Sequence, residues 1–131
     1  MIRLILVAAG GSLGAVARYG VGAAAQRLAP GAAWPWPTFS VNLVGGLAMG
    51  LLVGWLAQRG GAHAETWRLL IGVGLLGGFT TFSAFSLEIA LMIERRQMGL
   101  ALGYALASVI VAVVALFVGL WIMRRMAGGV L

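Results

Sequence analysis

The sequence has no cysteine, no lysine and no aspartate, and charged residues make up only 9% of its 131 residues. Without cysteine, disulfide bonds, thiol catalysis and thiolate metal sites are excluded. Soluble domains carry charge on about a quarter of their residues, so the shortage of charge excludes an ordinary soluble protein. Histidine and asparagine occur once each, at His63 and Asn42. The sequence contains neither a cluster of metal-ligand residues nor a strand-like alternation.

What the sequence does contain is hydrophobic. Hydrophobic residues account for 62% of the chain, and the mean hydropathy is +1.04. Because a helix needs about 20 apolar residues to cross a bilayer, the length allows about four crossings and leaves no room for a soluble domain. We therefore predict an all-α integral membrane protein in which residues 1–131 form a single membrane domain. The four transmembrane helices are expected at about 4–25, 38–57, 67–93 and 98–122.

The charge is strongly basic, with nine arginines, three glutamates and a formal net charge of +6. The arginines are scattered at the ends of the expected helices rather than gathered in a patch, so we interpret them as interfacial anchors and expect no nucleic-acid partner. Five of them share a side with the N-terminus, and three lie on the other side, or four if Arg18 is counted there. So weak a bias does not select one orientation. Insertion in both directions favours an antiparallel, dual-topology homodimer.

The first expected helix carries a stripe of residues spaced four apart, namely Gly10, Gly14, Arg18 and Gly22. Small residues at this spacing let a second helix approach closely. Arg18 interrupts the stripe on the packing face, where an arginine is costly unless it reaches water or a partner. Two interpretations stay open: Arg18 extends to the headgroups, or it lies in an aqueous vestibule.

Two further helices carry isolated polar groups. Asn42 shares a face of the second helix with several glycines, and an amide at that depth bonds either a neighbouring helix or a substrate. Tyr104 and Ser108 lie four residues apart in the last helix. They either belong to a polar track or make local packing contacts.

The stretch at 77–86, GGFTTFSAFS, is polar, aromatic and glycine-rich inside a span that has no charge from 69 to 87. Backbone groups that leave a helix at this depth must be enclosed by protein or line a cavity. We therefore predict that the third helix breaks, with unwinding at Gly77 and Gly78. Phenylalanines and hydroxyl residues each recur every third position beyond the break. Hydroxyls in membrane helices often bond back to the preceding turn, but the two rows, the break and Glu88 together favour a working site.

A different motif in the same helix, G-x-G-x-x-G at 72–77, matches the pattern of dinucleotide-binding loops. That pattern has meaning only between a strand and a helix of a βαβ unit. Since nothing here supplies a strand, we expect these glycines to serve helix packing.

Three motifs together carry a resemblance to a known family. They are GGSLGAVARY at 10–19, VNLVG at 41–45, and GGFTTFSAFS at 77–86 followed by Glu88. In this order and spacing, over nearly the whole chain, the sequence resembles the CrcB/Fluc family of fluoride channels. It departs from the family pattern at Ala84, where members often have threonine.

The resemblance implies a passive fluoride channel of a prokaryotic inner membrane, built as a dual-topology dimer with two pores and a sodium ion at the two-fold axis, and without enzymatic activity. Gly77 and Thr80 would offer backbone carbonyls to the sodium ion, and Arg18 would lie in a vestibule. The residues expected along the fluoride pore are Asn42, Thr81, Phe82, Ser83, Phe85, Tyr104 and Ser108.

Two other function classes fit a small four-helix membrane protein. A proton-coupled exporter of lipophilic cations needs a carboxylate embedded in the membrane. The first helix has no such group, and Glu88 lies towards the end of the third helix. A structural or assembly protein without transport activity would explain the glycine stripe but not Asn42 together with the phenylalanine row.

Overall fold

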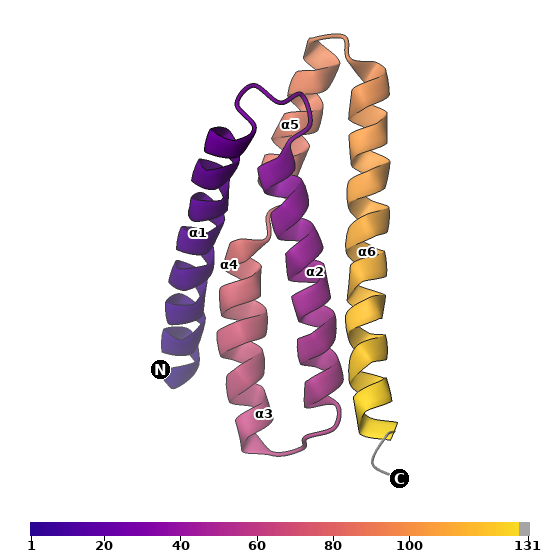
Figure 1. Ribbon diagram of the computed structural model, residues 1–131. Helices are drawn as coiled ribbons and strands as arrows, with labels where there is room; N and C mark the ends of the chain where they lie inside the picture. Colours follow the sequence, from indigo (N-terminus) through magenta and orange to yellow (C-terminus); the bar gives the residue numbers. More distant parts are fainter. Residues whose placement is uncertain (129–131) are drawn as a thin grey trace.

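The computed structural model describes residues 1–128, all within helices or their short connections. Four segments are long and apolar enough to cross a membrane: Ile2–Leu28, Trp36–Leu56, Ala62–Glu94 and Met98–Gly128. They run alternately up and down as a bundle (Figure 1). The prediction of four membrane-spanning helices is thus confirmed. Each expected range falls inside an observed segment except at residue 57, which follows the second helix.

The first, second and fourth segments are single helices, α1 (Ile2–Leu28), α2 (Trp36–Leu56) and α6 (Met98–Gly128). Helix α2 begins at Trp36 because Pro35 precedes it and Pro37 lies in its first turn, where the missing N–H of proline costs nothing. Helix α6 continues six residues beyond the expected end at 122, through Arg124 and Arg125. Arginines in a last helical turn are favourable because they lie at the negative end of the helix dipole.

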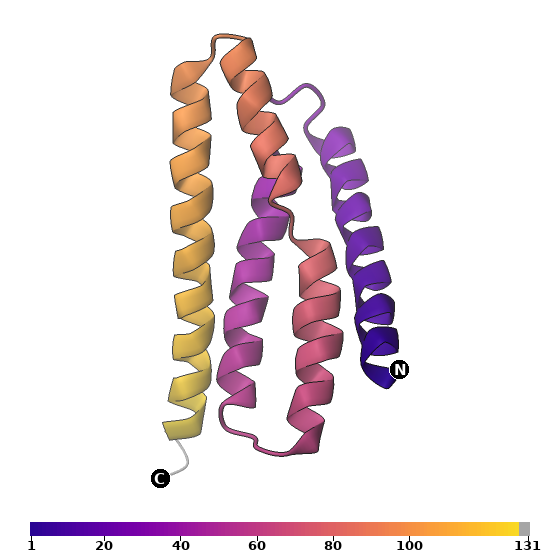
Figure 2. The ribbon, with the colours of Figure 1, turned by 180° about the vertical axis from the view of Figure 1, so that it is seen from behind.

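The third segment is divided into four pieces: α3 (Ala62–Trp67), the π-helix η1 (Arg68–Leu76), α4 (Gly77–Phe79) and α5 (Ser83–Glu94). The predicted break is present, and both views show it as an extended link between α4 and α5 (Figures 1 and 2). Its position differs from the prediction. Gly77 and Gly78 are helical, and the chain becomes extended at Thr80, with φ −79° and ψ 159°.

Gly78 does not unwind because it serves close packing. A Cβ atom at Gly78 would lie 2.5 Å from the carbonyl oxygen of Gly11 and 3.1 Å from its Cα. One turn away, a Cβ at Gly74 would lie 2.9 Å from Cα of Gly10. The glycines of α1 and those of η1 and α4 thus bring two backbones into direct contact, as the stripe predicted. Of the G-x-G-x-x-G glycines, Gly74 takes part in this packing, and Gly72 faces the side chain of Leu52 in α2. No strand occurs among the described residues.

A second glycine contact joins α2 to α6. A Cβ at Gly50 would lie 3.1 Å from Cα of Gly119, and Gly46 faces the backbone of Ala112. Gly22, the last member of the α1 stripe, has open space beside it. The bundle therefore consists of two closely packed pairs, α1 with η1 and α4, and α2 with α6, which leaves α5 to pack chiefly on α6.

Candidate functional site

The break between α4 and α5 is held by a single side chain from α2. The Thr81 amide donates to Oδ1 of Asn42 at 2.9 Å, and Nδ2 of Asn42 donates to the Thr81 carbonyl at 3.1 Å. Of the two interpretations left open for Asn42, the bond to a neighbouring helix is therefore present. An amide nitrogen carries two hydrogens, so the second Nδ2 hydrogen is not used by this pair.

The break also changes which amides donate hydrogen bonds to the carbonyls around it. In a continuous helix the Thr81 and Ala84 amides would donate to the carbonyls of Gly77 and Thr80. Here Thr81 donates to Asn42, and Ala84 donates to Oγ1 of Thr81 at 3.2 Å. Gly77 and Thr80 are thus among the carbonyls that lose their helical donors at the break.

Arg18 reaches across from α1 to the same place. Its Nε donates to the carbonyl of Gly78 at 3.1 Å, and the side chain is half-buried. A cation suits this position because the C-terminal end of a helix carries partial negative charge. Arg18 is thus placed against α4 rather than extended to the headgroups. It lines a cavity of about 550 Å³ that also touches Thr38, Thr81 and Ala84.

The phenylalanines beyond the break, Phe82 and Phe85, do not line the cavity that Arg18 lines. Phe82 and Phe85 have ring centroids 5.7 Å apart at an interplanar angle of 43°. Phe82 is 78% exposed, whereas Phe85 is 8% exposed and packs on Tyr104 with centroids 5.3 Å apart. The row does not extend to Phe79, because the extended link separates it from Phe82, which immediately precedes α5, and from Phe85 within α5.

A cavity of about 390 Å³ brings several of the predicted residues together. Its polar and aromatic lining consists of Asn42, Thr80, Thr81, Phe82, Phe85 and Ser108. Ser108 is buried, and its hydroxyl has no hydrogen-bond partner in the described part of the chain. A buried hydroxyl without a partner is uncommon. It therefore marks a place where a polar ligand or water would be favourable.

The hydroxyls of the break behave in two ways. Thr80 and Ser86 bond back to the carbonyls of Leu76 and Phe82, each at 2.9 Å, as hydroxyls in membrane helices commonly do. Thr81 and Ser83 instead face each other, with hydroxyl oxygens 3.3 Å apart. Neither of these two hydroxyls bonds back to a carbonyl of a preceding helical turn.

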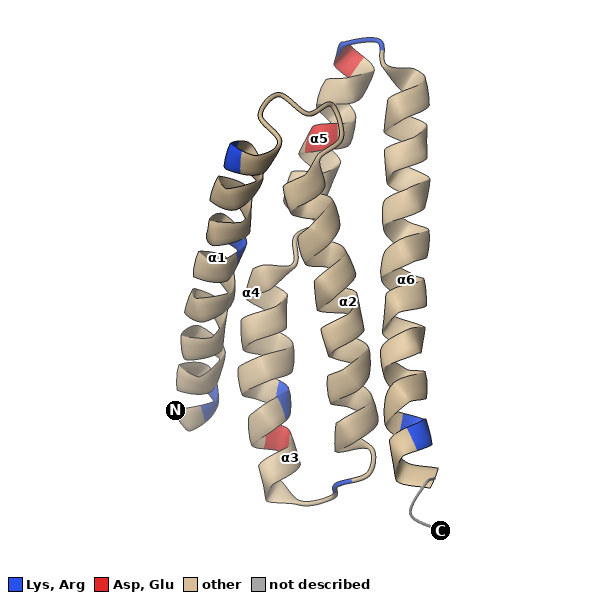
Figure 3. Cartoon of the chain, in the orientation of Figure 1, with Lys and Arg blue, Asp and Glu red and all other residues tan. Residues whose placement is uncertain are grey.

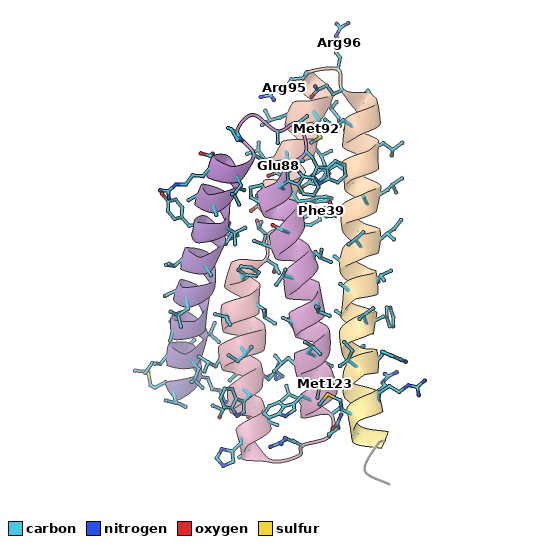
Figure 4. All side chains as sticks on the ribbon, viewed as in Figure 1. Phe39, Glu88, Met92, Arg95, Arg96 and Met123 are labelled. Atoms are coloured by element: carbon cyan, nitrogen blue, oxygen red, sulfur yellow. The ribbon has the colours of Figure 1, made fainter. Side chains whose placement is uncertain are left out.

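One polar cluster was not foreseen from the sequence. The Glu88 carboxylate (labelled in Figure 4) lies on α5 near the upper end of the bundle. It accepts a hydrogen bond from the hydroxyl of Thr38 and another from that of Tyr104, both at 2.6 Å. Three different helices supply these groups, and Tyr104 is 0% exposed. Thr38 enters the sequence analysis only as the first residue of the expected range 38–57. A single sequence gives no indication that Thr38 and Glu88, 50 positions apart, face each other.

The cluster lies next to the aromatic core at this end of the bundle. Phe85, Met92, Ala101 and Tyr104 are buried together, and the loop residue Trp34 packs against them (Figure 4). Because Tyr104 touches Phe85 with its ring and Glu88 with its hydroxyl, it connects the carboxylate to one of the two phenylalanines beyond the break.

Residues 5–120 match the family model described as CrcB-like protein, Camphor Resistance (CrcB). The chain belongs to the CrcB family. The sequence-based recognition is therefore confirmed, and it covers all four helices of this CrcB chain.

Curated relatives extend over the same length. The protein from Caulobacter sp. strain K31 is 64% identical over 125 residues, covering 95% of this chain and 97% of the relative. That from Phenylobacterium zucineum strain HLK1 is 64% identical over 126 residues, with 95% and 98% covered. The Novosphingobium aromaticivorans protein is 54% identical over 128 residues, with 97% and 100% covered. All three are named "Fluoride-specific ion channel FluC".

Proposed function

We propose that this CrcB-family chain is a passive, fluoride-selective ion channel that lets fluoride leave the cytoplasm of a prokaryotic cell. The observation that carries the proposal is the 390 Å³ cavity in which Phe82, Phe85 and the unpartnered hydroxyl of Ser108 meet at the helix break. The names of the bacterial relatives give independent support.

The residues around the break suit a small, strongly hydrated anion. A pore must replace the water of such an ion with hydrogen-bond donors, and the candidates are the Ser108, Thr81 and Ser83 hydroxyls and the second Nδ2 hydrogen of Asn42. Phenyl rings present a positive edge, so Phe82 and Phe85 would attract the anion weakly. Conduction needs binding that is favourable enough for entry and weak enough for release.

The remaining predicted residues extend this path in both directions. Arg18 would attract anions into the 550 Å³ cavity on one side of the break. Tyr104 would continue the path from Ser108, one helical turn away, towards Glu88. Both oxygens of Glu88 already accept hydroxyl donors, which leaves the carboxylate poorly suited to the coupling role that a cation exporter requires.

A second, inverted copy of the chain would complete the pore. Phe82 is 78% exposed in one chain, so one wall of the site is open. The arginines also leave the orientation undecided: with Arg18 bound inside the bundle, five lie at the end of the termini and three at the other (Figure 3). An antiparallel homodimer in the inner membrane, with two pores related by a two-fold axis, fits both observations.

The central sodium ion of this proposal would bind to the carbonyls of Gly77 and Thr80. Hard cations prefer oxygen ligands, and these two carbonyls are among those that lose their helical donors at the break. Two carbonyls from each of two chains would place four oxygens around the axis. The ion would hold the extended links of the two chains together and have no part in conduction.

The test is efflux from liposomes that contain only this protein. We expect rapid electrogenic loss of fluoride with little loss of chloride, and we expect Phe82→Ile to abolish it. Ser12→Ala is the matched control because Ser12 bonds only to the carbonyl of Ala8 within α1. Export of a lipophilic cation driven by a proton gradient, without electrogenic fluoride loss, would contradict the proposal.

A further inference from the structure

A cavity of about 510 Å³ lies at the end of the bundle where α1 begins and α6 ends, away from the break between α4 and α5. It is enclosed by the end of α2, the connecting loop and α3. The lining residues are Trp55, Leu56, Arg59, Gly60, His63, Ala64 and Trp67. None of them belongs to the proposed fluoride path.

The loop holds the guanidinium of Arg59 over this cavity. The Arg59 amide donates to the Leu56 carbonyl at 3.1 Å, and this turn brings the guanidinium to 4.8 Å from the centroid of the Trp55 ring. Nε2 of Gln58 donates to the Met123 carbonyl at 2.8 Å and fixes the loop to α6 (Figure 4). A guanidinium stacked on an aromatic face keeps its edge N–H groups free to donate to the oxygens of a phosphate or carboxylate.

The wall of the cavity beside Arg59 is aromatic. Trp55 and Trp67 meet edge to face, with centroids 6.2 Å apart and an interplanar angle of 85°. Trp67 is 44% exposed, and tryptophan prefers the boundary between headgroups and acyl chains. The cavity therefore offers a cation and an apolar wall at the depth where a phospholipid has its phosphate and glycerol.

The charge around the cavity selects the kind of headgroup. No lining residue is acidic, and the Arg59 guanidinium is the full charge in the lining. The nearby Glu65 carboxylate is engaged by Arg3 at 3.3 Å. A choline headgroup would bring its own cation close to Arg59. Basic pockets of this kind favour anionic lipids.

We propose that this cavity binds the phosphate–glycerol headgroup of an anionic phospholipid, with the phosphodiester facing Arg59 and the glycerol against Trp55 and Trp67. The acyl chains stay in the bilayer. The site is independent of fluoride conduction, so it holds or fails separately from the channel function.

The experiment is native mass spectrometry of the purified full-length protein with equal amounts of dioleoyl phosphatidylglycerol and dioleoyl phosphatidylcholine. We expect the wild type to retain phosphatidylglycerol about fivefold more strongly, the effect of one basic residue near an anionic headgroup. Arg59→Gln is expected to bind the two lipids about equally. Trp67→Leu, which removes a wall but no charge, is expected to retain less phosphatidylglycerol than the wild type.

Arg125→Gln is the matched control. Arg125 also stacks on a tryptophan, with its guanidinium 5.3 Å from the Trp121 centroid, but it lies outside the cavity. It should keep the full preference. An equal loss in Arg125→Gln and Arg59→Gln would overturn the proposal in favour of diffuse charge attraction. Displacement of the lipid by an equal concentration of glycerol 3-phosphate would overturn it in favour of a site for soluble phosphate esters. Wild-type fluoride efflux by Arg59→Gln would show that the variant is folded.

Discussion

Asn42 and Thr81 are joined by two hydrogen bonds that run in opposite directions between α2 and the link between α4 and α5, at 2.9 and 3.1 Å. The pair satisfies both backbone groups of Thr81 at a depth where a bilayer supplies no water. It also allows the third span to leave helical geometry, because the Thr81 amide no longer needs the carbonyl of Gly77. The Asn42 side chain thus supplies both partners of the Thr81 backbone at the break.

We predict that Asn42→Leu lowers the stability of the protein by about 1–3 kcal/mol, because the Thr81 amide and carbonyl would be left without partners. Fluoride efflux should fall with it. Thermal unfolding in detergent, followed by tryptophan fluorescence, measures the first effect. Asn42→Asp can still accept from the Thr81 amide but cannot donate to its carbonyl, so its stability should be intermediate. A melting temperature for Asn42→Leu equal to that of the wild type would contradict the role of the pair.

Glu88 and Tyr104 should be energetically coupled. Tyr104→Phe removes one donor to the carboxylate, and Glu88→Gln weakens the acceptor of both hydroxyls, so each change alone should destabilise the protein. The effects of substitutions within one hydrogen-bond network do not add. The loss of unfolding free energy in the double variant should therefore be smaller than the sum of the two single losses, by about 1 kcal/mol or more. The same unfolding measurement on the wild type, the two single variants and the double variant gives the coupling free energy between the two side chains. Strict additivity would indicate that the 2.6 Å contact contributes nothing to stability.

The sequence allowed the number and type of the helices to be predicted because hydrophobic length alone determines them. It also indicated that the third span breaks within the stretch at 77–86, since polar and aromatic residues are conspicuous in an uncharged span. It misplaced the break by a few residues, because glycine serves unwinding and close packing equally well. Only the position of Gly11 against Gly78 distinguishes the two uses.

The polar contacts were beyond sequence reasoning for a different reason. Asn42 with Thr81, and Glu88 with Thr38 and Tyr104, join residues 16 to 50 positions apart in the chain. Their pairing depends on how the helices are rotated, which a weakly amphipathic membrane helix does not reveal. The π-helical geometry of η1 adds to this uncertainty, since it changes which residues of the third span face α1.

Arg18 should affect fluoride efflux through both its charge and its hydrogen bond. Arg18→Gln removes the cation from the 550 Å³ cavity, so efflux should slow most at low ionic strength, where attraction of anions is least screened. Arg18→Lys keeps the charge but loses the Nε donor to Gly78, and it should recover part of the rate. Initial efflux rates at two salt concentrations separate the two contributions. A rate that is independent of salt in every variant would contradict a role in attracting anions.

The glycine contacts make the sharpest stability prediction, because the chain offers a control at a comparable site. Gly74→Ala would place a methyl group 2.9 Å from Cα of Gly10, where the nearest atoms are backbone and cannot move aside. We expect a loss of about 1–3 kcal/mol from this overpacking. Gly22→Ala faces open space within α1 and should be neutral or stabilising by up to about 1 kcal/mol, since alanine favours helix more than glycine does. Melting temperatures that move in the same direction for both variants would show that helix propensity, rather than the contact between α1 and η1, decides the outcome.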